Sequence, residues 1–156
     1  MSTNKLENQQ VNLRQVNQDL MEMFTNVVWV EEYELKQSPF AALTVKELHT
    51  IYVISMYDEK TASQVAKAVH LSPSAMTTAI DRLVDKGYVE RRRSKEDRRV
   101  VKLGLTHQGR VLYRAHRQFH YKVTKALMED MSTEEALAME RAVHNLQTYL
   151  KALLNS

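Results

Sequence analysis

Residues 88–106 read YVERRRSKEDRRVVKLGLT, and their pattern is that of two short strands joined by a charged turn. In the second half, Val101, Leu103 and Leu105 alternate with Lys102 and Gly104, which is typical of a strand with one buried face. Residues 88–93 form the first strand. The tip, residues 94–98, is too charged to be buried, and residues 90–99 hold six basic and three acidic side chains. The stretch therefore predicts a short basic hairpin.

Three short helices are predicted before the hairpin from the residues at which they start. Two capping boxes and one cap followed by proline mark these starts: Thr44/Glu47, Thr61/Gln64 and Ser72/Pro73. Gly87 falls where the third helix should end. Helices over 61–69 and 72–86, joined by a short turn and followed by a hairpin, give the element order of a winged helix-turn-helix.

Long helices flank this region on both sides. Apolar residues three and four apart predict a helix over 11–35, namely Leu13, Val16, Leu20, Met23, Phe24 and Val27, and Pro39 should stop it. Thr106 should cap a second long helix, and the Ser132/Glu135 capping box opens a last one. The last helix repeats apolar residues at 4, 3, 4 and 3, which is typical of packing along another helix: Met139, Val143, Leu146, Leu150 and Leu153.

These elements predict a mainly α fold, a winged helix-turn-helix with long N- and C-terminal helices. We expect residues 1–156 to form a single domain. Within it, 44–106 would be the winged lobe, and 1–38 and 107–156 would be helical dimerisation parts.

Charge is distributed unevenly along the 156 residues. Residues 1–57 carry a net charge of −3 (4 basic, 7 acidic), residues 58–125 carry +9 (16 and 7), and residues 126–156 carry −3 (2 and 5). A basic centre between acidic ends suggests that one part meets a polyanion while the ends meet something else, such as a second copy. The alternative is charge scattered on solvated faces.

Composition excludes several classes of protein. Cysteine is absent, which excludes disulfides, thiol nucleophiles and iron–sulfur clusters. With 3 glycines, and with neither a phosphate-binding Gly-rich loop nor a nucleophile elbow, the chain does not read as an enzyme. There is no apolar run of roughly 20 residues, and residues 1–8 lack the apolar core of a signal peptide. We therefore expect a cytoplasmic protein that does not bind membranes.

The helix expected over 72–86 suits an approach to DNA. Its first turns carry small side chains that leave its N-terminus open to phosphates and base edges: Ser72, Ser74, Ala75, Thr77 and Thr78. Arg82, one turn further, is long enough to reach a guanine or a phosphate. The alternative is a small-residue helix packed in a bundle.

The hairpin tip adds a second candidate DNA contact. Arg98 and Arg99, with Lys95 nearby, suit the negative potential of a minor groove. Asp97 would weaken phosphate binding, so we expect it to hold an arginine side chain by a charge-assisted hydrogen bond. The alternative is a solvated charged turn.

Residues 83–91 (LVDKGYVER) and 97–109 (DRRVVKLGLTHQG) resemble the wing signature of the MarR family of bacterial regulators, and the helix order makes the resemblance cover nearly the whole chain. It implies a homodimer whose first and last helices interlock, with two winged lobes on successive major grooves of a pseudo-palindromic operator in double-stranded DNA. It also implies that Asp97 orients Arg99 into the minor groove.

A narrower resemblance, to the FabT-type repressors of fatty-acid synthesis genes, is carried by residues 24–28 (FTNVV), 30–32 (VEE), 38–40 (SPF), 46–51 (KELHTI) and 114–120 (RAHRQFH). It implies no cofactor other than a co-repressor, a long-chain acyl group on acyl carrier protein. An acidic carrier would be attracted to the basic residues of one helix: Arg110, Arg114, Arg117 and Lys122. Five aromatic residues are candidates for the wall of an acyl tunnel, or for ordinary interface core: Trp29, Tyr33, Phe40, Tyr52 and Phe119.

The histidines leave a different function open. His116 and His120 share a helix face at a spacing that can hold a metal, and His49 with Glu31 or Glu32 could complete four ligands. Zinc-sensing members of the MarR family are similar here, which implies a regulator of uptake or efflux genes that senses zinc or another small ligand. The alternative is that these histidines hydrogen-bond carboxylates in a dimer core.

Overall fold

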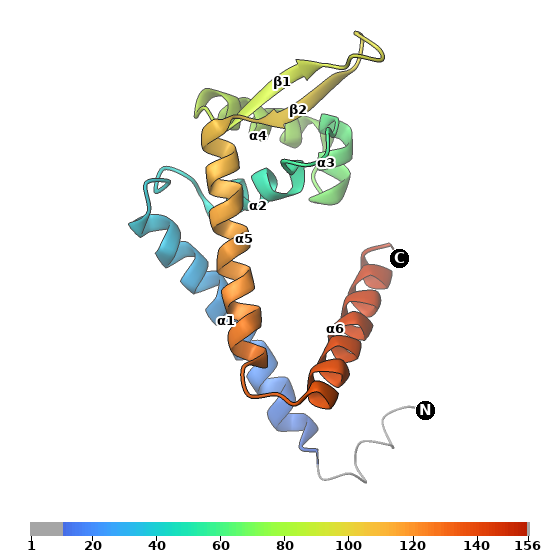
Figure 1. Cartoon of the computed structure of the whole chain (residues 1–156). Coiled ribbons are helices and arrows are strands. Elements are labelled where there is room, and N and C mark those ends of the chain that lie inside the picture. Colours follow the sequence, from blue (N-terminus) through green and yellow to red (C-terminus); the bar gives the residue numbers. More distant parts are fainter. Residues whose placement is uncertain (1–10, 156) are drawn as a thin grey trace. The chain divides into compact units, whose positions relative to one another are not determined.

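The computed structural model describes residues 11–155, so residues 1–10 of the predicted N-terminal dimerisation part lie outside the described residues. Between residues 11 and 155 the chain forms six helices and two strands (Figure 1). In order they are α1 (Leu13–Gln37), α2 (Val45–Ile54), α3 (Ala62–Ala68), α4 (Pro73–Asp85), β1 (Val89–Arg93), β2 (Val101–Leu105), α5 (His107–Met128) and α6 (Thr133–Leu154). The mainly α winged fold predicted from the sequence is confirmed. The chain divides into two compact units between Arg114 and Ala115, inside α5.

The predicted helix starts are all present. In α2 the Thr44 hydroxyl accepts from the Glu47 N–H at 3.2 Å, and the Glu47 carboxylate accepts from the Thr44 N–H at 2.8 Å. The same reciprocal pair opens α3 at Thr61/Gln64 and α6 at Ser132/Glu135. Each cap stabilises its helix by about 1 kcal/mol, because it gives hydrogen-bond partners to N–H groups that have none inside the helix.

The first unit is built around one apolar core, which the helices α2–α4 and the hairpin enclose. Its most deeply buried side chains come from all of these elements: Ile51, Ile54, Val65, Met76, Ile80, Leu83, Val89 and Leu103. Leu35, near the end of α1, and Leu112, near the start of α5, join the same cluster. Burying each large apolar side chain contributes roughly 1.5–3 kcal/mol, so the core fixes α4 and the hairpin against one another.

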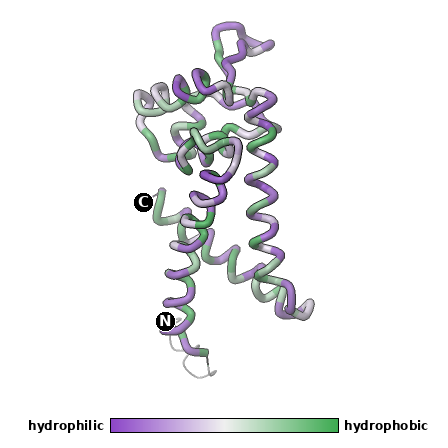
Figure 2. Tube along the Cα trace, turned by 90° about the vertical axis from the view of Figure 1, so that its left-hand side faces the viewer, coloured by the Kyte–Doolittle hydropathy of each residue, from purple (hydrophilic) through white to green (hydrophobic). Residues whose placement is uncertain are grey.

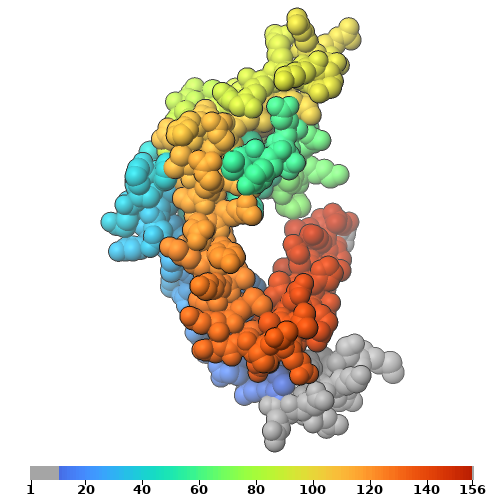
Figure 3. Space-filling view, in the orientation of Figure 1, coloured from blue at the N-terminus to red at the C-terminus, as the bar shows by residue number. Residues whose placement is uncertain are grey.

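The hairpin pairs β1 with β2 in antiparallel register, from Val89 opposite Leu105 to Arg93 opposite Val101. The Leu103 N–H also donates to the Lys60 carbonyl at 2.8 Å, a bridge that the alternation did not predict. Leu103 and Leu105 are buried, but Val101, expected on the same face, is 44% exposed. It lies toward the tip, where the hairpin extends past the helices of this unit (Figure 3).

The second unit contains the rest of α5 together with α6. Within Thr133–Leu154 no residue is buried, and Val143, Leu150 and Leu153 of the predicted repeat are exposed. Hydrophobic positions recur along α6 in Figure 2. Among residues 11–155, no helix combines the length and the apolar character needed to cross a membrane.

Candidate nucleic-acid interface

Helix α4 separates a buried face from an exposed polar face. Met76, Ile80 and Leu83 point into the core. The residues predicted to approach DNA are all exposed: Ser72, Ser74, Ala75, Thr77, Thr78 and Arg82. This separation follows from the helical period, since residues three and four apart share a face. The structure therefore keeps the small polar face of α4 open.

The hydroxyl groups of this face are held by the helix itself. Thr77 donates to the Pro73 carbonyl at 3.0 Å, and Thr78 donates to the Ser74 carbonyl at 3.2 Å. The Ser72 hydroxyl accepts from the Ala75 N–H at 3.2 Å and caps the helix. A hydroxyl that donates locally keeps its lone pairs for an external donor, and the positive end of the helix dipole favours an anion. The face can thus accept hydrogen bonds from bases and attract a phosphate.

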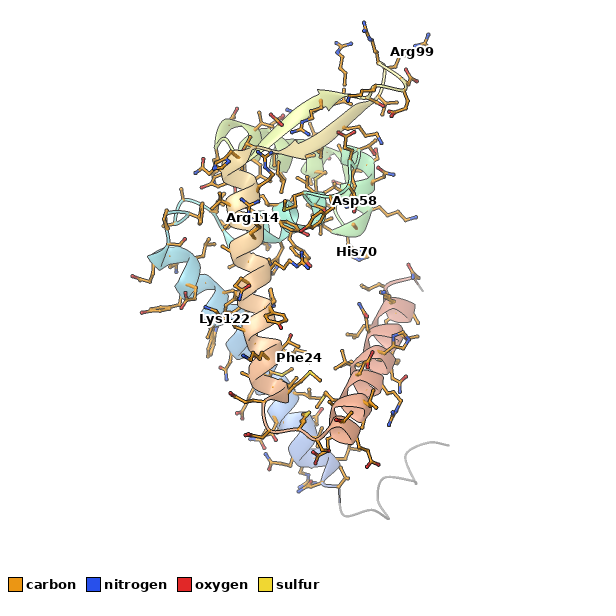
Figure 4. The ribbon with its side chains drawn as sticks, viewed as in Figure 1. Phe24, Asp58, His70, Arg99, Arg114 and Lys122 are labelled. Atoms are coloured by element: carbon orange, nitrogen blue, oxygen red, sulfur yellow. The ribbon has the colours of Figure 1, made fainter. Side chains whose placement is uncertain are left out.

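The tip of the wing is a compact turn with exposed cations. The Ser94 N–H donates to the Val100 carbonyl at 2.9 Å, and the Val100 N–H donates to the Asp97 carbonyl at 3.0 Å. The side chains of Lys95, Arg98 and Arg99 are exposed, and Arg99 projects at the end of the hairpin (Figure 4). The tip is also the hydrophilic end of the hairpin (Figure 2).

Asp97 acts on Arg99 differently from the expectation. Its carboxylate accepts from the main-chain N–H of Arg99 at 2.9 Å, a local turn bond, rather than from a guanidinium group. A two-residue separation favours this contact because the short carboxylate side chain reaches the nearby backbone first. Asp97 therefore shapes the backbone that carries Arg99.

Three arginines of the hairpin have partners within the fold, which the sequence did not reveal. Arg91 pairs with Asp81 of α4 at 2.6 Å, so β1 is tied to the helix beside it. Arg92 pairs with Glu90, and Arg93 reaches the Arg98 carbonyl at 3.5 Å. Exposed ion pairs contribute about 0–1 kcal/mol each to the stability of the fold, so their main effect is to fix the directions of these arginine side chains. The charge pattern gave no sign of this division, because it depends on which carboxylates lie across the fold.

Comparison with known proteins agrees with this geometry. Residues 43–101 match the model of the MarR family. FabT of Streptococcus pneumoniae, solved in complex with DNA, is 39% identical, with a TM-score of 0.82, over 91% of this chain and 99% of that chain. The chain belongs to the MarR family. A MarR family protein from Bacillus stearothermophilus, 20% identical, shares the fold over 90% of this chain and 99% of that chain, with a TM-score of 0.69.

Curated relatives match over shorter stretches, and the chain spans less than two thirds of the length of the two described next. The transcriptional regulator YwhA of Bacillus subtilis is 32% identical over 53% of this chain, and that match spans 60% of its own length. The regulator YdgJ of the same organism is 29% identical over 60% of this chain and is matched over 57% of its length. Both are described as HTH-type transcriptional regulators, which agrees with the exclusion of an enzyme.

The residues expected to bind an effector in this MarR chain fall into two groups. Trp29 and Tyr33 of α1 are 64% and 63% exposed. Tyr52 stacks on Tyr113, with ring centroids 5.2 Å apart, and Phe40 meets the edge of Tyr88 at 6.2 Å. In the first unit, therefore, Phe40 and Tyr52 already belong to aromatic pairs, whereas Trp29 and Tyr33 present open surface.

The basic residues of α5 also differ among themselves. Arg110 is partly buried and donates to the Leu105 carbonyl at 2.8 Å. It lines a pocket of about 220 Å³ that also includes Tyr57 and Arg92 and none of the five predicted aromatic residues. Arg114 and Lys122 project from α5 (Figure 4), Arg117 is exposed, and Phe119 is half-buried.

Three of the histidines lie beside another residue of the type that binds metal ions. In the first unit, His49 Nε2 is 3.2 Å from a carboxylate oxygen of Glu31, a buried residue. Glu32, the other partner considered, pairs instead with Lys36 at 2.8 Å. In the second unit, the rings of His116 and His120 meet edge to face with centroids 4.5 Å apart, and His116 is 6% exposed. Each pair has the chemistry of metal ligands as well as that of a hydrogen-bonded core.

Proposed function

We propose that this chain is a homodimeric, sequence-specific DNA-binding repressor of fatty-acid synthesis genes. Its co-repressor would be a long-chain acyl group carried on acyl carrier protein. The observation that carries the proposal is the 39% identity, over 91% of the chain, to a FabT protein whose structure was solved with DNA. The exposed polar face of α4 and the basic wing tip supply the chemistry that such a complex needs.

DNA binding would use the two features in different ways. The small residues on the exposed face of α4 allow the helix to enter a major groove, where Arg82 can reach a guanine or a phosphate. Arg99, carried on the turn that Asp97 holds, would enter the flanking minor groove. Lys95 and Arg98 would meet phosphates on either side.

Dimerisation is supported by apolar surface on the terminal helices. The stripe of α1 has exposed members in Leu13, Val16 and Phe24, and α6 exposes Val143 and Leu150. Apolar repeats left open at spacings of three and four are covered in soluble proteins by another helix, and a second copy presents the same repeat. Two lobes would then meet half-sites about one helical turn apart, in a pseudo-palindrome.

The acyl co-repressor is supported by charge and by exposed aromatic surface. Arg114 and Lys122 place exposed cations on α5, the kind of surface that attracts an acidic carrier protein. Trp29 and Tyr33 offer open aromatic surface to an acyl chain.

The paired histidines favour a second candidate, a response to zinc. Glu31 with His49, and His116 with His120, each bring two ligand-type groups together. The two candidate functions differ in the effector that should change DNA binding, which is zinc in one case and the acylated carrier protein in the other.

Fluorescence anisotropy on a labelled promoter duplex from the fatty-acid synthesis operon of the host organism tests both candidates. Titration with acyl carrier protein that carries a long-chain acyl group should tighten binding to the duplex, and the unacylated carrier protein should not. Arg114→Gln should weaken this response, with Lys151→Gln on α6 as the matched control. A response to zinc alone, reversed by a chelator, would instead assign the regulator to metal, and no binding to the duplex would refute the fatty-acid role.

A further inference from the structure

Lys86 makes an unusually dense set of contacts at the C-terminal end of α4. Its ammonium group donates to the Ala42 carbonyl at 2.9 Å and to the two oxygens of the Glu47 carboxylate at 2.8 and 2.9 Å. Ala42 lies in the segment between α1 and α2, and Glu47 lies in the first turn of α2. One side chain thus ties the end of the candidate recognition helix to the segment through which the chain arrives from α1.

The partner of Lys86, Glu47, is also held in position by a contact that does not involve Lys86. Its carboxylate accepts from the Thr44 N–H in the capping box of α2, so its position is set by the helix start. The Glu47 side chain is 14% exposed and that of Lys86 is 34% exposed, so water screens this pair less than the Arg91–Asp81 pair, whose side chains are 41% and 55% exposed. Burial alone would raise the pKa of Glu47, but its bonds with Lys86 and Thr44 lower it below the ordinary value.

The two residues after Lys86 are hydrogen-bonded to the residues at the start of α5. The Gly87 carbonyl accepts from the Thr106 hydroxyl at 2.7 Å, and the Tyr88 carbonyl accepts from the Thr106 N–H at 3.1 Å. The Tyr88 hydroxyl accepts from Gln108 at 3.1 Å. Residues 86–88 therefore join the end of α4 both to the segment that comes from α1 and to the start of α5.

We propose that Lys86 is a positioning residue for DNA recognition: its clamp on Ala42 and Glu47 sets the direction of α4 relative to the segment from α1, and thereby the half-site spacing that the dimer accepts. The inference rests on the proposed function, since it needs a dimer that reads two half-sites. Lys86 acts through α4 rather than on DNA, because its ammonium group is occupied by the Ala42 carbonyl and the Glu47 carboxylate.

Spacing selectivity separates this role from a purely stabilising one. One base pair inserted between half-sites moves one of them by about 3.4 Å and rotates it by about a tenth of a turn. A dimer whose lobes are held rigidly binds only one of the two duplexes well. A dimer whose lobes lack the Lys86 clamp can adjust to both half-site spacings, whatever the melting temperature of the protein.

The experiment compares two duplexes for each variant. The wild-type protein selects its preferred duplex from a random-sequence library, and a second duplex carries one inserted base pair between the half-sites. Lys86→Met removes the charge and keeps the stem, whereas Glu47→Gln removes the ion pair and keeps a residue that completes a capping box. Lys36→Met, which breaks the exposed pair with Glu32, is the matched control. Anisotropy gives both affinities, and thermal unfolding is followed in parallel.

The wild type and Lys36→Met should prefer the selected spacing by about tenfold or more, equivalent to about 1.4 kcal/mol, and Lys86→Met and Glu47→Gln by less than about threefold. The double variant should add nothing to either single one, because both remove the same clamp. An unchanged spacing preference in folded Glu47→Gln and Lys86→Met, with or without a lower melting temperature, overturns the inference. Failure of the wild type to select a duplex with two half-sites would overturn the proposed function itself.

Discussion

Replacing Gly109 with alanine should destabilise the lobe strongly although alanine favours helices. A Cβ built on Gly109 would lie 2.2 Å from the Tyr88 carbonyl oxygen and 3.2 Å from Leu105 Cβ. The first turn of α5 would have to move by about 1 Å, which costs roughly 1–3 kcal/mol as overpacking. The movement also weakens the hydrogen bond from the Thr106 N–H to the same carbonyl, worth about 1 kcal/mol. The helix propensity of alanine returns at most about 1 kcal/mol, so the net loss is about 1–3 kcal/mol.

Thermal unfolding followed by circular dichroism measures this loss, which corresponds to a melting temperature lower by roughly 2–12 °C for a chain of this size. Gly104→Ala is the matched control, because its Cβ would meet the guanidinium group of Arg92, the end of a flexible side chain that can move aside. A Gly109→Ala protein as stable as the wild type would refute the close packing of α5 against Tyr88.

Four further outcomes are expected. Arg99→Ala should weaken binding to A·T-flanked operators by about 1–3 kcal/mol in anisotropy titrations, and unchanged affinity would refute its place in the minor groove. Arg82→Ala should change the base preference in a library selection if Arg82 reads a guanine, whereas a uniform loss across sequences marks a phosphate contact. The pKa of Glu47 in the folded protein is lowered from its ordinary value of 4.5. The ionised Glu47 carboxylate therefore contributes fully to the free energy of unfolding above pH 4.5, and this contribution is lost as the pH falls through the lower folded pKa. Denaturant titrations of wild type and Glu47→Gln should therefore differ at neutral pH and converge in acid. Leu150→Lys on the exposed repeat of α6 should shift the mass measured by light scattering toward the monomer, and an unchanged dimer would place the interface elsewhere.

Elements whose hydrogen bonds are local could be predicted from the sequence. The capping boxes at Thr44, Thr61 and Ser132 each link a residue to the one three positions later, so spacing alone specifies them. The exposed face of α4 followed from the helical period in the same way. Alternation correctly placed Leu103 and Leu105 in the core, but it could not show where the core ends and Val101 becomes exposed.

Contacts between distant residues could not be predicted, because they depend on which side chains packing brings together. Glu31 and Glu32 are equally plausible partners for His49 in the sequence. The direction in which each side chain leaves α1 decides between them, and His49 meets Glu31. Lys86 and Glu47 are 39 positions apart, and no local pattern links them.

The wing shows why a count of basic residues overstates the surface that meets DNA. Six cations lie within residues 90–99, but Arg91 is committed to Asp81 of α4, and Arg92 to Glu90. The Arg91–Asp81 pair holds the base of the hairpin against α4, the Arg92–Glu90 pair lies within β1, and Lys95, Arg98 and Arg99 remain exposed at the tip. Without such a contact, the hairpin would become ordered only when it binds DNA. Ordering each long side chain on binding costs about 0.5–1.5 kcal/mol. We expect the Arg91–Asp81 pair to lower that cost, because it holds the hairpin in place before DNA binds. On the proposed function, Arg91 would then serve DNA recognition without contacting DNA.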